Sequence, residues 1–192
     1  MKKITLVFMV VLLFSSVVFA QSQNNVTWDM AIVKQARSGE ESFSHQQPIT
    51  GLKSGDEYCI FIRALSPVYC YVVQENSDRT SNILFNGRLE SEQVMLIPGD
   101  DNFTIPPGTG LIRYRVIVSA TPKANLDRQG KLSGAQHDAL INEIQVISRS
   151  LSQVALAPEL PVPMGGGTRG SDTIVYQNKG QETYVKNIVI RH

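Results

Sequence analysis

Two neighbouring runs in the middle of the chain are hydrophobic at both odd and even positions. In "EYCIFIRA" (Glu57 to Ala64), one tyrosine and two isoleucines fall on one face of a strand, and cysteine and phenylalanine fall on the other. The run "VYCYVVQ" (Val68 to Gln74) has the same character. Strands that are apolar on both faces are usually covered on both sides, as in a sandwich or a sheet beneath a helix. We therefore expect a β-rich core over residues 52–122, with these two runs joined as a hairpin around "LSP".

Shorter strand-like runs surround this pair. "VTWDMAIVK" has the apolar content of a first strand, and "ILF" starts another that Asn86-Gly87 ends as a tight turn. "QVMLIPG" and "NFTIPPG" are short strands that end at proline and glycine. The run "LIRYRVIVSA" is the longest, with one face formed by Ile112, Tyr114, Val116 and Val118. The predicted fold class is mainly β, an antiparallel β-sandwich-like domain.

The pattern changes to a helical period after Pro122. Apolar residues form one stripe over about residues 134–156, and Ser133 with Gln136 matches a capping box. The stripe consists of Leu140, Ile144, Ile147, Leu151 and Val154. We expect this amphipathic helix to pack on the sheet; the alternative is that it binds a partner, because the spacing also suits a short coiled coil.

The end of the chain returns to a strand pattern. Residues 157–171 ("APELPVPMGGGTRG" and its flanks) form a Pro- and Gly-rich linker, and residues 172–192 are predicted to be a final β-hairpin that turns at Asn178-Lys179-Gly180. We expect this pair to complete the same β-domain. The alternative is an exposed edge to which another protein adds a strand. Residues 21–192 are thus expected to be a single domain.

The first twenty residues have the pattern of a secretory signal peptide. Lys2 and Lys3 precede an apolar run, and small residues stand before a cleavage point between Ala20 and Gln21. The predicted location is periplasmic or extracellular. Loss of residues 1–20, which contain two lysines and no acid, leaves 16 basic and 17 acidic side chains. That balance indicates no nucleic-acid partner. No later apolar run is long enough for a transmembrane span.

Cys59 and Cys70 are the only cysteines, and in an exported chain a pair suggests a disulfide. The predicted hairpin leaves the question open. A two-residue turn places the two side chains opposite each other, one more residue puts them on opposite faces, and two more make them diagonal neighbours too far apart for an unstrained bridge. The alternative is two small buried apolar side chains.

Several motifs together resemble a family of bacterial domains. "SGDEYCIFI", "YCYVV", "NILFN", "LIPGDDNFTIPPGTG" and "RYRVIVSATP" follow in order over about Leu52 to Pro122. Their order and spacing resemble the bacterial domain of unknown function, family 4384, although Asn86-Gly87 stand where that family tends to have Pro-Asn. The resemblance implies an all-β noncatalytic unit attached to enzymes or envelope proteins, and it carries over no functional residue.

Motifs for catalysis, metal binding or cofactor binding are absent from the sequence. His45, His137 and His192 have no spacing typical of metal ligands, and the paired acids lie in loop-like segments. The sequence therefore predicts no catalytic, metal or cofactor residue, and favours a noncatalytic binding or assembly module whose partner is another envelope protein. Its binding residues are expected in the loops "ENSDRT" and "PGDDN", on the helix stripe or on the final hairpin. The alternatives are a small envelope hydrolase acting on glycan or peptide, with a loop acid or with His45 or His137, and a carrier of a small ligand.

Overall fold

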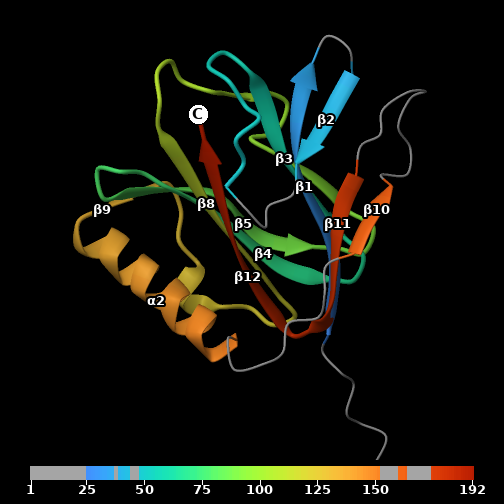
Figure 1. Cartoon of the computed structure of the whole chain (residues 1–192). Helices are drawn as coiled ribbons and strands as arrows, with labels where there is room; N and C mark the ends of the chain where they lie inside the picture. Colours follow the sequence, from blue (N-terminus) through green and yellow to red (C-terminus); the bar gives the residue numbers. More distant parts are fainter. Residues whose placement is uncertain (1–24, 37–38, 44–47, 152–159, 164–173) are drawn as a thin grey trace, which may run out of the picture.

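The computed structural model describes residues 25–36, 39–43, 48–151, 160–163 and 174–192. The predicted signal peptide and its cleavage point at Ala20 and Gln21 lie outside these residues, as does most of the predicted linker. The described chain is mainly β, with two antiparallel sheets and one α-helix (Figure 1). This confirms the predicted sandwich-like fold class.

The larger sheet has seven strands. Its main order is β10-β11-β1-β3-β6, with β2 beside β1 and β7 beside β3. The strands are β1 (Val26–Ala36), β2 (Gly39–Phe43), β3 (Glu57–Ala64), β6 (Val94–Ile97), β7 (Phe103–Thr104), β10 (Leu160–Pro163) and β11 (Ile174–Gln181).

The smaller sheet has five strands in the order β12-β8-β4-β5-β9. They are β4 (Val68–Glu75), β5 (Thr80–Leu89), β8 (Leu111–Ser119), β9 (Lys131–Ser133) and β12 (Thr183–Arg191). A short 3-10 helix, η1 (Ala124–Leu126), and the α-helix α2 (Ala135–Leu151) lie between β8 and the last strands.

The space between the sheets is the main hydrophobic core. Alternate residues of β1, β3 and β8 enter it because successive side chains of a strand point to opposite faces. The largest of them are Trp28, Tyr58 and Tyr114, each no more than 1% exposed. The predicted face of β8 is confirmed, with Tyr114, Val116 and Val118 fully inside the core.

Helix α2 covers the outer face of the five-stranded sheet (Figure 1). Leu140 and Ile144 are fully buried against Tyr71, Val73 and Ile117 of that sheet. The expectation that the helix packs on the sheet is therefore confirmed, although Val154 of the predicted stripe lies outside the described residues.

The predicted capping box is wrong. Ser133 is the last residue of β9, and the helix follows Gly134, whose φ of +53° lies in the left-handed region. The carbonyl of Gly134 accepts a hydrogen bond of 3.0 Å from the amide of Asp138. Glycine at this position permits the sharp change from strand to helix.

The first predicted hairpin is also wrong, because β3 and β4 belong to different sheets. The residues between them cross from one sheet to the other. The amides of Leu65 and Ser66 donate to the carbonyl of Thr27 at 2.9 and 3.2 Å, which fixes this crossing against β1.

The crossing settles the arrangement of the two cysteines. Neither Cys59 nor Cys70 is in a disulfide, and both are buried. Cys70 lies in the core between the sheets, whereas Cys59 lies on the outer face of the seven-stranded sheet with Ala31, Val33, Phe61 and Val175. The sequence left open whether the two are bridged; a bridge required β3 and β4 to pair, and these strands belong to different sheets.

Asn86-Gly87 does not form the predicted turn. Both residues lie inside β5, where Gly87 is opposite Cys70 of β4. A Cβ atom on Gly87 would approach the ring of Phe85 to 3.2 Å, so the glycine leaves space for that ring.

The last two strands do not pair with each other as a hairpin. β11 pairs with β1 and β10 in the larger sheet, and β12 pairs with β8 in the smaller one. Only Glu182 separates them, so the chain turns a corner between sheets at this residue. The expectation that these strands complete the same β-domain is confirmed, and Leu160–Pro163 of the predicted linker forms β10.

Candidate functional site

The loop "ENSDRT" connects β4 and β5, and its polar side chains stabilise the local structure. Asp78 Oδ1 accepts hydrogen bonds from the hydroxyl and amide of Thr80 at 2.6 and 3.1 Å. The bond from the Thr80 hydroxyl is the main reason that the pKa of Asp78 is lowered. Arg79 forms an ion pair of 2.7 Å with Asp138 at the start of α2. The pair is exposed, and such pairs contribute little to stability.

His137 lies against a hydroxyl group. Its Nδ1 lies 2.8 Å from Ser81 Oγ, which resembles one pair of a nucleophile and a base. Ser81 is 0% exposed and His137 is 6% exposed, so no substrate reaches the hydroxyl in this conformation. Asp138 contacts Arg79 rather than orienting the imidazole. We infer that the pair joins α2 to β5 as a structural contact.

The other sequence-predicted residues are not brought together with this pair. His45 lies outside the described residues, and His192 Nδ1 is 3.3 Å from the carbonyl of Gly108. Asp100 and Asp101, in the loop between β6 and β7, are both exposed. Among the residues that the structure describes, no group of three or more His, Cys, Asp or Glu side chains is placed to hold a metal ion.

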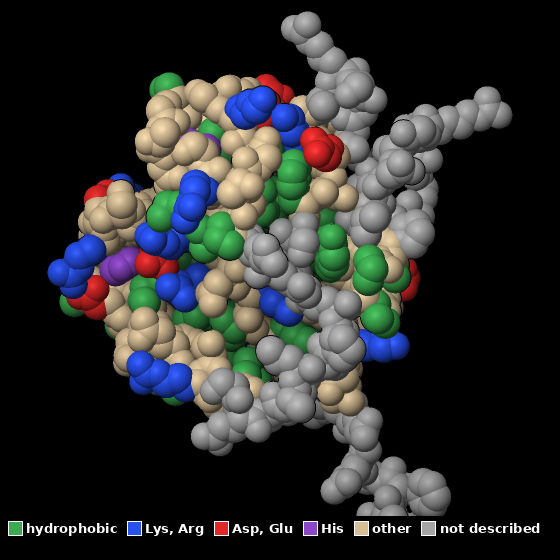
Figure 2. Space-filling view, viewed as in Figure 1, with side chains coloured by type: hydrophobic (Ala, Val, Ile, Leu, Met, Phe, Trp, Pro, Cys, Tyr) green, Lys and Arg blue, Asp and Glu red, His purple; other side chains and the backbone are tan. Residues whose placement is uncertain are grey.

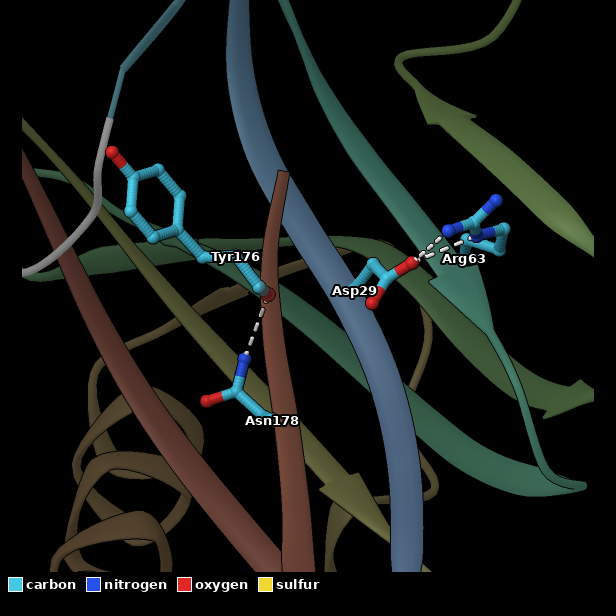
Figure 3. A network of polar contacts seen from close by, with 4 residues as sticks. All are labelled: Asp29, Arg63, Tyr176 and Asn178. Atoms are coloured by element: carbon cyan, nitrogen blue, oxygen red, sulfur yellow. Dashed lines mark hydrogen bonds and ion pairs between the residues drawn. The ribbon is translucent and has the colours of Figure 1, made fainter. Parts of the chain in front are cut away.

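A buried ion pair lies on the outer face of the seven-stranded sheet (Figure 3). Asp29 of β1 stands opposite Arg63 of β3, and Arg63 Nε donates to Asp29 Oδ2 at 2.8 Å. Asp29 is 0% exposed, and its other oxygen, Oδ1, has no hydrogen-bond partner in the described structure. On the far side of β1, Asn178 Nδ2 donates to the carbonyl of Tyr176 at 3.1 Å. The Asp29–Arg63 pair supplies charge at an otherwise apolar face, beside the cluster that contains Phe61 and Cys59.

A cavity of about 470 Å³ lies where the end of α2 meets the corner between β11 and β12. Volumes of this order are typical of sites for small molecules. Ile147 and Leu151 supply its apolar part, and Lys123 and Glu182 supply opposite charges. The remaining lining residues are Asn25, Ser150, Gly180, Gln181 and Thr183.

The amide of Gln181 has unused hydrogen-bonding capacity. Gln181 is 7% exposed, and neither Nε2 nor Oε1 of its side chain has a hydrogen-bond partner within the described ranges. Buried polar atoms are normally hydrogen-bonded, so unsatisfied ones are often found where a ligand or water binds. Gln181 thus adds a polar feature to the lining of the cavity.

The cavity adjoins an edge strand. β12 is the last strand of its sheet and pairs with β8 on one side. On the other side, the amide of Ile49 donates to the carbonyl of Val189, and the amide of Arg191 donates to the carbonyl of Ile49, each at 2.8 Å. Ile49 therefore covers the C-terminal end of this edge, through an isolated parallel bridge to Ile190.

The direction of these two bonds shows which backbone groups of β12 face away from β8. Val189 and Arg191 bond outward, and the direction of backbone groups alternates along a strand. The outward groups at the other end of β12 are therefore those of Thr183, Val185 and Asn187. Of these three residues, Thr183 lines the cavity.

Sequence reasoning found the final strands but not this site. Lys123, Ile147 and Glu182 are far apart in the sequence, and only the folded chain places them around one cavity. Two predicted signals pointed towards it: the helix stripe, whose Ile147 and Leu151 line the cavity, and the possibility of an exposed edge near the C-terminus.

Comparison of the chain with protein-family models, with curated proteins and with solved structures found no match. The resemblance to family 4384 thus stays a prediction. In the described part of the chain, no helix combines the length and the apolar character that spanning a membrane requires.

Proposed function

We propose that the chain is an exported, noncatalytic binding or assembly module of the bacterial cell envelope, and that its partner is another envelope protein. Export is supported by the arrangement of Lys2, Lys3, the apolar run and the small residues before Gln21. The resemblance of residues 52–122 to accessory envelope domains supports the same role.

The observation that carries the proposal is the outward edge of β12 next to a cavity of about 470 Å³. Unpaired backbone groups and a neighbouring pocket are what domains that recognise extended peptides offer to a partner. The cavity combines the apolar residues Ile147 and Leu151 with the charged residues Lys123 and Glu182. Such a mixed lining suits a side chain of a partner protein.

The alternative of a small hydrolase has less support. Its best candidate pair is Ser81 and His137, and Ser81 is completely buried. A carrier of a small ligand would need an open cavity between the sheets, and large side chains such as Trp28 and Tyr58 occupy that space. Neither alternative explains the outward edge of β12.

Cross-linking in cells tests the proposal. A C-terminally tagged full chain is expressed in a bacterium that secretes it, cross-linked, and purified under denaturing conditions. We expect a chain that begins at Gln21, fractionates with the envelope and carries one recurrent cross-linked protein. A chain that keeps Met1 and stays in the cytoplasm, or one that is cross-linked to no protein, would contradict the proposal.

A further inference from the structure

A second depression lies along β12, at the opposite end from the cavity. It has a volume of about 210 Å³ and is lined by Glu75, Arg113, Tyr114, Arg115, Asn187, Ile188 and Val189. Both hollows therefore flank the same edge strand, one at Thr183 and one at Asn187.

The side chains at these two positions point to the same face of the sheet. Tyr184, Ile188 and Ile190 enter the core between the sheets, so Thr183, Val185 and Asn187 face the side that α2 covers. Val185 confirms this, because it packs against the cluster under α2. Thr183 and Asn187 are four residues apart, or about 13 Å along a strand.

The second depression carries a basic group that no acidic side chain in the described part of the chain neutralises. Arg115 pairs with Glu75 at 2.7 Å and donates to Asn187 Oδ1 at 3.0 Å. Arg113 stands opposite Glu75 on β4 and opposite Val189 on β12, yet it makes no ion pair with any described residue. The site thus has two guanidinium groups, those of Arg113 and Arg115, and one carboxylate, that of Glu75. The excess of positive charge favours an acidic ligand.

Figure 2 shows the face on which β12 and α2 lie. Lys and Arg side chains are spread over it, with apolar side chains and some Asp and Glu side chains between them. A ligand for this face should combine apolar and acidic groups.

We propose that the edge of β12 from Thr183 to Asn187 binds an extended segment of the partner protein, which adds to the sheet as a further antiparallel strand. The segment has an acidic side chain beside Arg113 and, four residues later, an apolar side chain in the cavity of Ile147 and Leu151. The antiparallel direction is chosen because antiparallel pairing is slightly more stable per residue. The backbone hydrogen bonds provide affinity, and the two hollows provide specificity. This inference rests on the proposed binding function and names the surface that performs it.

A labelled synthetic peptide tests the inference by fluorescence anisotropy with the mature chain. The probe is a nine-residue peptide of threonines with one glutamate and, four positions later, one leucine. We expect saturable binding, weakened at least tenfold when the leucine is replaced by threonine. Absence of saturable binding, or equal binding of the threonine peptide, would overturn the inference.

The backbone part is tested with Val185→Pro. The amide of Val185 points away from β8, so proline removes an outward donor and leaves the pairing with β8 in place. Val185→Thr is the matched control, because it keeps the amide and the branched shape. We expect binding to fall at least tenfold in V185P and to remain within twofold in V185T. Equal binding by a folded V185P and the wild type would exclude strand addition at this edge.

The charge part is tested by reversal. Arg113→Glu should weaken binding of the glutamate peptide at least tenfold and strengthen binding of a peptide with lysine in place of glutamate. Arg88→Glu on β5, three strands from β12, is the control and should change neither. If R113E and R88E behave alike, the assignment of the acidic position is wrong.

The same variants separate this inference from the proposed function. A cross-linked envelope protein that is captured equally by wild type, V185P and R113E would refute the edge but leave the binding role intact. Capture of no protein at all would refute the role itself. If sedimentation shows a dimer of the chain that V185P dissociates, and the peptide does not bind, the edge belongs to a second copy and the inference is overturned.

Discussion

The hydroxyl groups of Tyr58 and Tyr114 form a hydrogen bond of 2.7 Å that connects the two sheets through the core. Tyr58 lies on β3 and Tyr114 on β8, and each is 1% exposed. The ring of Phe103 lies against both, with centroid distances of 5.4 and 5.6 Å. The two hydroxyls satisfy each other in a place that water does not reach.

Removing both of these hydroxyls should cost less than the sum of removing each one alone. Tyr58→Phe leaves the Tyr114 hydroxyl buried without its partner, and we expect a loss of about 1–3 kcal/mol in the free energy of unfolding. The double variant Y58F/Y114F should lose less than the sum of the single variants, because no polar group is then stranded. Urea unfolding of the four proteins measures the coupling; additive effects would show that the bond contributes nothing.

The same pair should make the protein sensitive to alkali. Burial raises the pKa of Tyr58 to about 12, and burial also raises the pKa of Tyr114. In the unfolded chain both phenols ionise near pH 10, so this contribution to stability is complete below pH 10 and is lost as the pH rises towards 12. The expected slope reaches about 1.4 kcal/mol per pH unit for each tyrosine.

Urea unfolding at several pH values between 8 and 12 checks this dependence. The control is Y58F/Y114F, which retains the other tyrosines and lacks the two buried phenols. A slope above pH 10 that is equal in both proteins would assign the alkaline sensitivity to other groups.

The Asp29–Arg63 pair should be far more sensitive to loss of one member than to loss of both. Arg63→Met leaves a fully buried carboxylate without its cation, and we expect about 3–5 kcal/mol of destabilisation. The double variant D29L/R63M should recover much of this loss, because paired apolar side chains often replace a buried ion pair at little cost. Thermal and urea unfolding provide the measurement. A double variant less stable than R63M would show that the unpaired buried carboxylate is not the cause of the destabilisation.

Helix α2 offers an internal comparison of buried and exposed positions. Ile144 is 0% exposed and Val146, two residues later, is 51% exposed. Ile144→Ala should lower the free energy of unfolding by about 2–5 kcal/mol through the cavity it leaves. Val146→Ala should change it by less than about 0.5 kcal/mol. Similar values for the two variants would mean that the helix does not stay on the sheet in solution.

The cysteines provide a chemical check of the strand arrangement. Burial raises the pKa of the Cys70 thiol, so it should be unreactive in the native state. Titration of the denatured, unreduced protein with a thiol reagent is expected to find two thiols per chain. A value of zero would indicate a disulfide, and with it a different path for β3 and β4.

Local patterns predicted most of the secondary structure correctly. Alternation over "LIRYRVIVSA" and the stripe through Leu140 and Ile144 depend on neighbouring residues, and both describe the folded chain. The assignment of strands to sheets depends on longer-range contacts. β3 and β4 are apolar on both faces, so they suit a hairpin and a sheet crossing equally. The long-range pairing of β3 with β1 and of β4 with β8 distinguishes the two.

The candidate site was less predictable for the same reason. The outward edge of β12 exists because the chain passes at Glu182 from β11 in the larger sheet to β12 in the smaller one, so the two strands do not pair. The sequence around Asn178-Lys179-Gly180 suggested a hairpin turn instead. The turn predicted at Asn86-Gly87 was wrong for a similar reason: Gly87 leaves space for the ring of Phe85 and does not turn the chain. Glycine and asparagine mark turns only where the strands on both sides of them pair with each other.

The position of the last two strands has a consequence for the synthesis of the protein. β1 lies between β3 and β11, and Met30 is opposite Tyr176, near the other end of the chain. β8 likewise lies between β4 and β12. Long sequence separation between contacting residues slows folding. A nascent chain that stops before Ile174 lacks one neighbour for each of these central strands, so both sheets are completed only after β11 and β12 have left the ribosome.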